Sequence, residues 1–243
     1  ASTTAHSNVA IGRQALDSTT AGSELVAIGT YAGTAYVGNA GTTGAFGVFI
    51  GHTAGFQVTG NGSYKSITLV GHAAGYSATG AQSSTGIGAS ALYYADGALN
   101  TTAVGRTAGA FDEGTGSVWV GDSAGYRISG NYNVAIGYEA LSGASSGTGY
   151  GTAEKNVAIG RQSLAGVTSG RINVAVGYNA GKSMTTGYSN VSLGNEAGYS
   201  ITTGRKNVAV GNQAGYSMST GTGSVMIGEF AGGYNTANYT IGI

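Results

Sequence analysis

Three groups of residues have the chemical types that catalysis or metal binding requires. His52 and His72 each follow an aliphatic-Gly pair in consecutive stretches of similar sequence. Two imidazoles are too few for a zinc site, which takes at least three protein ligands. Asp112 and Glu113 are neighbours that would point apart in an extended loop, so they form a poor acid and base pair for glycoside hydrolysis. The glycine-rich segment 147–151 lacks the Lys-Ser/Thr pair and the following helix of a phosphate loop. We therefore expect no enzyme, no metal site and no cofactor.

Composition narrows the class of protein further. The chain has 243 residues, of which 47 are Gly, with no Pro or Cys. Ten basic residues balance ten acidic ones, so a nucleic-acid partner is not expected. No apolar run approaches the roughly 18 residues that span a membrane, so membrane insertion is not expected either. Hydrophobic residues make up 41% of the chain and fall at fixed positions, which argues against disorder.

One short motif recurs along the whole chain. An aliphatic residue followed by Gly occurs fourteen times, most often 17 residues apart, with Val two residues earlier in ten copies. The aliphatic-Gly pairs begin at Ile11, Ile28, Ile50, Val70, Ile87, Val104, Val120, Ile136, Ile159, Val176, Leu193, Val210, Ile227 and Ile241. Fixed columns repeated this often are typical of a solenoid, in which like residues stack from turn to turn.

The spacing of the apolar residues is that of β-strands. Residues two apart share one face of a strand, so each Val and the following Ile point the same way, with a small residue such as Ala10 between them. Gly recurs too often for helices. Segment 199–204 predicts a second short strand in each repeat. The sequence thus predicts an all-β parallel β-solenoid, or β-roll, of about fourteen turns, as one repeat domain over residues 1–243.

The Val and Ile columns form a continuous aliphatic stripe. If Ala and Gly line the inside of each turn, this stripe needs another cover, and symmetry-related copies of the same stripe would supply it. We therefore expect a homotrimer; the alternative puts Val and Ile inside a monomeric roll. The predicted trimer or core packing residues are Val9, Ile11, Val134, Ile136, Val157, Ile159, Val174, Val176, Val208 and Val210.

The motif also resembles a known family. Asn-Val-Ala-Ile-Gly at 133–137 and 156–160, and Asn-Val-Ala-Val-Gly at 173–177 and 207–211, are similar to the head repeats of YadA-like trimeric autotransporter adhesins and to repeats of phage tail fibres. The resemblance implies a left-handed parallel β-roll, trimeric and extracellular, on a cell surface or a virion. The period of 17 is longer than the adhesin head repeat. The chain contains no stalk heptads, neck motif or membrane anchor, so the choice between adhesin and fibre stays open.

Recognition residues are expected in the longer intervals between motifs. Insertions on a rigid scaffold often carry binding residues, and three stand out, at Thr34–Phe46, Phe56–Ser66 and Ser142–Lys155. The receptor-binding candidates in them are Tyr36, Asn39, Phe46, Tyr64, Lys65, Tyr150, Glu154 and Lys155. A tyrosine file, Tyr76, Tyr126, Tyr199 and Tyr216, either packs over the glycine turns or contacts a ligand.

The predicted function is non-enzymatic attachment of a rigid trimeric rod to a host-surface glycan or protein. One alternative is an architectural subunit whose solenoid ends join into an extracellular filament. Another is ice binding through Thr186, Thr203 and Thr220, although that row is interrupted near Ser129 and Ala78.

Overall fold

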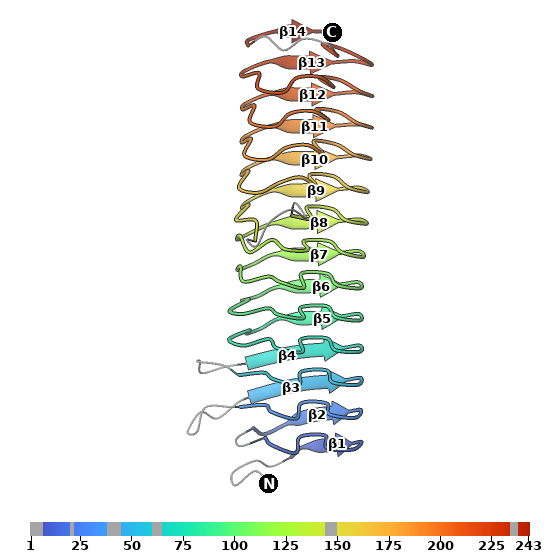
Figure 1. The fold of residues 1–243 in the computed structure, drawn as a ribbon, viewed down its shortest axis with the longest axis vertical. Coiled ribbons are helices and arrows are strands. Elements are labelled where there is room, and N and C mark those ends of the chain that lie inside the picture. The colour runs from blue at the N-terminus through green and yellow to red at the C-terminus, as the bar shows by residue number, and fades with distance from the viewer. Residues whose placement is uncertain (1–6, 20–21, 38–44, 60–64, 144–149, 234–237) are drawn as a thin grey trace. The chain divides into compact units, whose positions relative to one another are not determined.

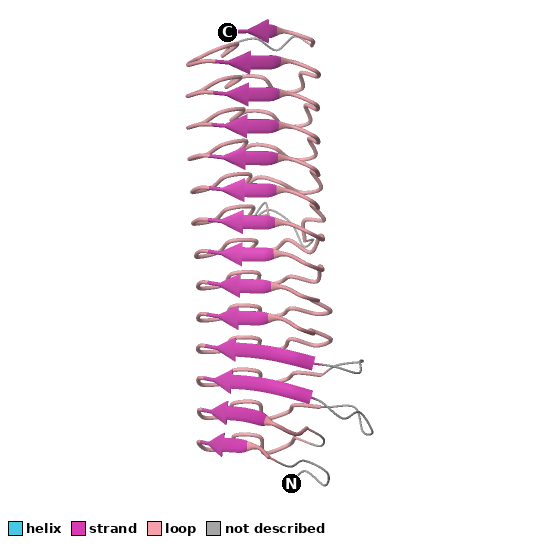
Figure 2. Ribbon diagram, turned by 180° about the vertical axis from the view of Figure 1, so that it is seen from behind, coloured by secondary structure: helices cyan, strands magenta, loops and turns pink. Residues whose placement is uncertain are grey.

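The computed structural model describes residues 7–19, 22–37, 45–59, 65–143, 150–233 and 238–243. The chain divides into two compact units, Ala1–Asp122 (the N-terminal unit) and Ser123–Ile243 (the C-terminal unit). The described residues of both units form strands and turns and contain no helix (Figure 2).

The N-terminal unit is a stack of seven parallel strands in chain order (Figure 1). Its pairs join the same columns of successive motifs, as in Val9↔Val26 and Ile11↔Ile28. The strands are β1 (Val9–Ile11), β2 (Leu25–Ile28), β3 (Ala45–Ile50), β4 (Lys65–Val70), β5 (Thr85–Ile87), β6 (Thr102–Val104) and β7 (Val118–Val120).

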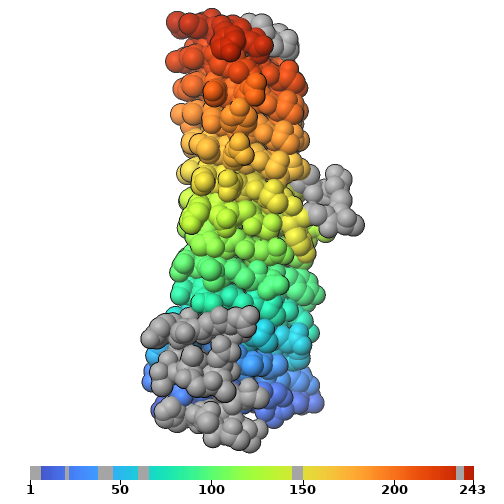
Figure 3. Space-filling view, turned by 90° about the vertical axis from the view of Figure 1, so that its left-hand side faces the viewer, coloured from blue at the N-terminus to red at the C-terminus, as the bar shows by residue number. Residues whose placement is uncertain are grey.

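The C-terminal unit repeats this arrangement. Its pairs again keep the columns together, as in Val174↔Val191 and Val176↔Leu193. Its turns lie on one another in close-packed layers on the face shown in Figure 3, from yellow to red. The strands are β8 (Val134–Ile136), β9 (Val157–Ile159), β10 (Val174–Val176), β11 (Val191–Leu193), β12 (Val208–Val210), β13 (Val225–Ile227) and β14 (Ile241–Gly242).

These strands confirm the predicted parallel β-solenoid, with one correction to its turns. Seven strands enclose six turns in each unit, hence about 12 turns. The second strand expected at 199–204 is absent, because that segment consists of turns and bends. Its backbone still bonds to the next turn, as when Ser200 N donates to Tyr216 O at 3.0 Å and Thr202 N donates to Ser219 O at 2.8 Å. Stacking of turns therefore replaces the ladder of a second sheet.

From β2 to β13, the residue just before the aliphatic-Gly pair points into the solenoid. Ala135, Ala158 and Ala175 are fully buried, while the flanking Val and Ile columns are half-buried or exposed. In the N-terminal unit the same inward position holds the large side chains of Phe49 and Trp119. The Val and Ile columns therefore lie outside the solenoid, as the expectation of an outward stripe required, and not in its core.

A large inward side chain in a strand is matched by Gly in a second column of the same turn. The second column lies four residues after the Gly of each aliphatic-Gly pair. The residue there has a positive φ in every turn and is either Gly or Leu. Where the strand contributes Phe49, a Cβ added at Gly55 of the same turn would clash with the phenyl ring. Where the strand contributes only Ala158, Leu164 occupies this position at φ 52° and is fully buried. Leu accepts a strained backbone there because it fills the space that Ala leaves.

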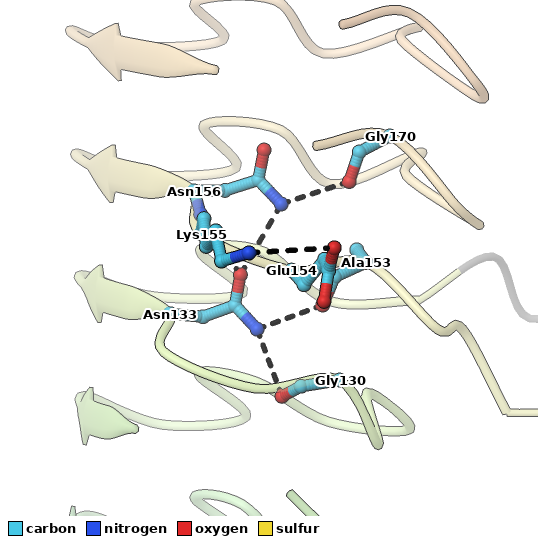
Figure 4. Close-up of polar contacts among 7 residues, drawn as sticks. All are labelled: Gly130, Asn133, Ala153, Glu154, Lys155, Asn156 and Gly170. Atoms are coloured by element: carbon cyan, nitrogen blue, oxygen red, sulfur yellow. Dashed lines mark hydrogen bonds and ion pairs between the residues drawn. The ribbon is translucent and has the colours of Figure 1, made fainter. Parts of the chain in front are cut away.

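A second internal feature is a ladder of buried asparagines in the C-terminal unit (Figure 4). Asn133 Nδ2 donates to Gly130 O at 3.0 Å and to Ala153 O at 2.8 Å, in its own turn and the next. Its Oδ1 accepts from the backbone N of Asn156 at 3.0 Å. The same pattern continues through Asn173, Asn190 and Asn207. Each amide thus satisfies backbone groups of two turns and fixes the entry to each strand.

Candidate functional site

The receptor-binding candidates of the insertions divide into several groups. Phe46 is 41% exposed and Tyr150 43% exposed, Lys155 is exposed, and Glu154 is half-buried. Asn39 and Tyr64 lie outside the described residues. For Lys65 the structure describes the backbone at the start of β4 and not the side chain.

Tyr36 is a core residue and not a surface contact. Its side chain is fully buried, with its ring 5.7 Å from that of Phe49. Burial raises the pKa of the Tyr36 hydroxyl to about 12. The prediction that Tyr36 contacts a receptor is therefore wrong. The strand before it, β2, points Leu25 and Ala27 inward, and the first residues of the insertion return to fill the core beside them.

Glu154 and Lys155 belong to a regular surface that the structure assembles from several turns. The two residues before each buried Asn form one step of this surface, and the steps stack in register. Ile172 N donates to Glu154 O at 3.1 Å, Ser189 N to Arg171 O at 3.0 Å, and Lys206 N to Tyr188 O at 3.1 Å. The second residue of each step has φ close to 57°, which turns the chain into the strand. We call residues 154–155, 171–172, 188–189 and 205–206 the cationic edge.

The cationic edge carries four basic side chains and one tyrosine. The guanidinium carbons of Arg171 and Arg205 lie 5.5 Å and 5.9 Å from the centroid of the Tyr188 ring. Arg205 Nη1 also donates to the Tyr188 hydroxyl at 3.2 Å. Both guanidinium groups are thus held in place by one ring. Arg171, Arg205 and Lys206 are all exposed.

Glu154 is the one carboxylate of this edge. It lies 3.8 Å from Lys155 Nζ, an exposed pair of small energetic value (Figure 4). The remaining acidic residues of the C-terminal unit follow their strands and bond to neighbouring turns. Gln162 donates to Glu139 at 2.6 Å, Gln213 to Glu196 at 2.7 Å, and Asn212 to Glu229 at 3.3 Å. The edge therefore keeps an excess of positive charge.

The C-terminal unit as a whole also has an excess of positive charge, and the N-terminal unit has an excess of negative charge. The N-terminal unit holds three basic and six acidic residues, whereas the C-terminal unit holds seven basic and four acidic ones. Their formal net charges are −3 and +3, which cancel in the chain as a whole. A balance taken over the entire sequence hides this separation.

Asp112 is the one acidic residue found in the described core. Its Oδ2 accepts from Trp119 Nε1 at 3.1 Å and Thr101 Oγ1 at 3.0 Å, and its Oδ1 accepts from Gly114 N at 2.8 Å. Burial raises the pKa of this carboxyl to about 6 despite these hydrogen bonds. Glu113 is exposed, so the two carboxyls face different environments.

The histidines and the tyrosine file stack from turn to turn. His52 and His72 are exposed and parallel, with ring centroids 5.3 Å apart. Among the described residues no group of three or more His, Cys, Asp or Glu side chains is placed to hold a metal ion. Tyr199 and Tyr216 stack at 5.0 Å, and Phe56 and Tyr76 at 5.1 Å. These rings cover one another's faces and are half-buried, so they pack over the turns.

Two neighbouring columns of threonines in the C-terminal unit differ in exposure and hydrogen bonding. Thr186, Thr203 and Thr220 are exposed. In the column beside them, Thr168 and Thr185 donate their hydroxyls to backbone carbonyls of the next turn, both at 3.1 Å. One exposed file of hydroxyls therefore remains on this face.

Sequence reasoning found two residues of the cationic edge and missed Arg171, Tyr188, Arg205 and Lys206. Their signal was present in the sequence, because Glu154, Arg171, Tyr188 and Arg205 are each 17 residues apart. Glu154, Arg171 and Arg205 share one of the two columns before each Asn, and Lys155 and Lys206 share the other.

In the described residues no helix has the length and apolar character needed to cross a bilayer. No family model matches the chain, and no curated protein and no solved structure is similar to it.

Proposed function

We propose that this chain is a non-enzymatic attachment module of an extracellular fibre, and that it forms a homotrimeric, left-handed β-roll. The observation that carries the proposal is the outward aliphatic stripe. Val and Ile columns run along the strand face of both units, and Ile11, Ile136, Ile159 and Ile227 are 58%, 40%, 36% and 47% exposed. The resemblance to trimeric adhesin heads and tail fibres supports the same assembly.

A stripe of this kind favours self-association on energetic grounds. Covering the exposed part of one Val or Ile side chain contributes about 1 kcal/mol, and each strand presents two such positions. Contiguous apolar patches on soluble proteins mark interaction sites. Because the stripe recurs in every turn at one spacing, an identical stripe is its best geometric match, and a closed ring of three copies leaves none exposed.

Sedimentation equilibrium of the full chain tests the assembly. We expect three times the chain mass of 23.8 kDa at micromolar concentration. Val176→Glu, at a 36% exposed position of the stripe, should dissociate the trimer because it would bury a charge at the interface. Thr203→Glu, at an exposed turn position, is the matched control and should leave the trimer intact. A monomeric wild-type chain would refute the proposal.

Electron microscopy separates attachment from an architectural role. Discrete rods of uniform length support the attachment module. Filaments of indefinite length support the alternative, an extracellular structural subunit that joins end to end. Binding of the purified rods to a host-surface glycan or protein supplies the positive test of attachment.

A further inference from the structure

The cationic edge of the C-terminal unit combines three features that belong to a binding surface. Its cations lie in two adjacent columns, its guanidinium groups are held in place by Tyr188, and its exposed Arg and Lys side chains outnumber the single Glu154. A structural role explains the tyrosine contacts but not the surplus of charge. From this arrangement we propose that the cationic edge binds an acidic polysaccharide, whose carboxylates or sulfates contact Arg171 and Arg205. The inference rests on the proposed attachment role and names the chemical class of its ligand.

The spacing of the arginines suits a linear polymer of anionic sugars. Arg171 and Arg205 are two turns apart, which is roughly 10 Å at the spacing of stacked strands. This is close to the length of an extended disaccharide, so in a polymer with an acid group on each sugar, every second acid group matches a guanidinium group. Lys155 and Lys206 extend the run of positive charge by one column toward the strands.

The chemistry of the side chains favours carboxylate or sulfate. A guanidinium group presents a planar fork of N–H donors that engages two oxygens of one anion. Arg205 uses one Nη1 on the Tyr188 hydroxyl, and contact with the Tyr188 ring leaves the other N–H donors of the two guanidinium groups for a ligand. Because these groups are already ordered, binding loses less side-chain entropy than it would with free arginines.

The groups between the cations suit the rest of a sugar. Ile172 is 53% exposed and Tyr132, one step before Lys155, is 57% exposed, so both offer apolar contact to the C–H faces of pyranose rings. Ser189 lies between Ile172 and Lys206 in the column and adds a hydroxyl. A nucleic acid would need a denser run of cations, since a duplex carries one charge per roughly 1.7 Å of its axis.

Binding of polygalacturonate to the full chain tests the inference by isothermal titration calorimetry at low salt. Dextran is the neutral control polymer and a DNA oligonucleotide the competing polyanion. We expect binding to polygalacturonate that weakens as salt increases, and none to dextran. The double variant Arg171→Gln and Arg205→Gln should lower the affinity at least tenfold. Arg171→Lys with Arg205→Lys keeps the charge but loses the planar fork, and should give an intermediate loss.

The matched control removes two charges elsewhere in the same unit. Arg161 stacks on Tyr138 and Tyr178, and Lys182 lies over Tyr199. Arg161→Gln with Lys182→Gln changes the net charge equally and should leave the affinity within about twofold. Equal losses in both double variants would mean that net charge alone attracts the polymer and would overturn the site. Absence of binding by the wild-type chain, or tighter binding of DNA at the same residues, would overturn the ligand class.

Sedimentation of each variant keeps this inference separate from the trimer. If the wild-type chain is monomeric but its affinity depends on Arg171 and Arg205, the site stands and the assembly falls. If the chain is trimeric and polygalacturonate does not bind, the assembly stands and the site is refuted.

Discussion

Single residues in this fold act on two turns at once. Asn173 is an example, since its Oδ1 accepts from the backbone N of Asn190 at 3.0 Å and its Nδ2 donates to Gly187 O at 2.9 Å. In an ordinary turn an asparagine bonds only to nearby backbone. In the solenoid the neighbouring turn is equally close, so loss of one side chain leaves polar groups of two turns without partners.

Asn173→Ala should therefore lower the free energy of unfolding by roughly 2–4 kcal/mol, because it leaves a buried N–H and a buried carbonyl unpaired. Urea denaturation followed by circular dichroism measures the change. Asn195→Ala removes an exposed hydrogen bond to Asn212 and should cost less than about 1 kcal/mol. Similar losses at the two positions would contradict the role of the ladder.

Asp112 makes the stability of the N-terminal unit depend on pH. Its pKa is about 6 in the folded chain, above the ordinary value of 3.8, so between these values the folded state binds more protons than the unfolded state. The contribution of Asp112 to the free energy of unfolding is thus fully present below about pH 4, and it is lost as the pH rises through about 6. The two-unit shift corresponds to a loss on the order of 3 kcal/mol.

Asp112→Asn should remove this loss, so the difference in unfolding free energy between variant and wild type should change between pH 4 and 7. The fluorescence of Trp119, the one tryptophan of the chain, reports unfolding of this unit. Glu113→Gln alters an exposed neighbour and should follow the wild-type pH profile. A constant difference between Asp112→Asn and wild type across this range would show that Asp112 is not the titrating group.

At the scale of the element, a large inward side chain in a strand is matched by Gly in the turn that follows that strand. Phe49 in β3 faces Gly55, where an added Cβ would clash with the phenyl ring. Both columns are visible in the sequence: the residue between Val and Ile is usually small but is large at Phe49, Leu69, Trp119 and Met226, and the residue four positions after the motif Gly is Gly or Leu. The sequence did not show that the two choices depend on each other, because that dependence is a contact across the interior and not a spacing along the chain.

A double-mutant cycle tests this dependence. Phe49→Ala alone should cost about 3–5 kcal/mol by leaving a cavity, and Gly55→Leu alone should destabilise by overpacking. Together they should recover at least about 1 kcal/mol relative to the sum of the single losses, since Leu164 opposite Ala158 shows the reversed pair. Denaturant unfolding of the four proteins measures the coupling. Strict additivity would contradict the shared volume.

At the scale of the whole molecule, the sequence predicted the fold class well because the same motif occurs fourteen times and each copy indicates the same strand. Spacing showed where each strand lies and which columns stack, and the outward stripe followed from the small residues between Val and Ile. It placed Tyr36 wrongly because insertion length says nothing about which side chain returns to the core. It missed most of the cationic edge because charges 17 residues apart become neighbours only after folding.

Stacking by columns predicts that the fold tolerates removal of one complete turn. Deleting residues 174–190, one full period, joins Asn173 to Val191 and restores the Asn-Val junction. We expect cooperative unfolding with a lower free energy, because one set of neighbour contacts is lost. Deleting residues 174–186 breaks the column register and should prevent folding of the C-terminal unit. Equal circular dichroism and equal stability of the two deletions would contradict a fold held by register.

The 17-residue register also bears on how such a chain changes over generations. Copies that encode the same columns are substrates for unequal recombination, and an exchange in frame between two Asn-Val junctions adds or removes one turn without a mismatch. Length is then a heritable quantity that varies in whole steps. The number of turns that carry cations can therefore change by gain or loss of a copy. In this way the length of the cationic edge can be matched to the length of its polymer without any new side chain.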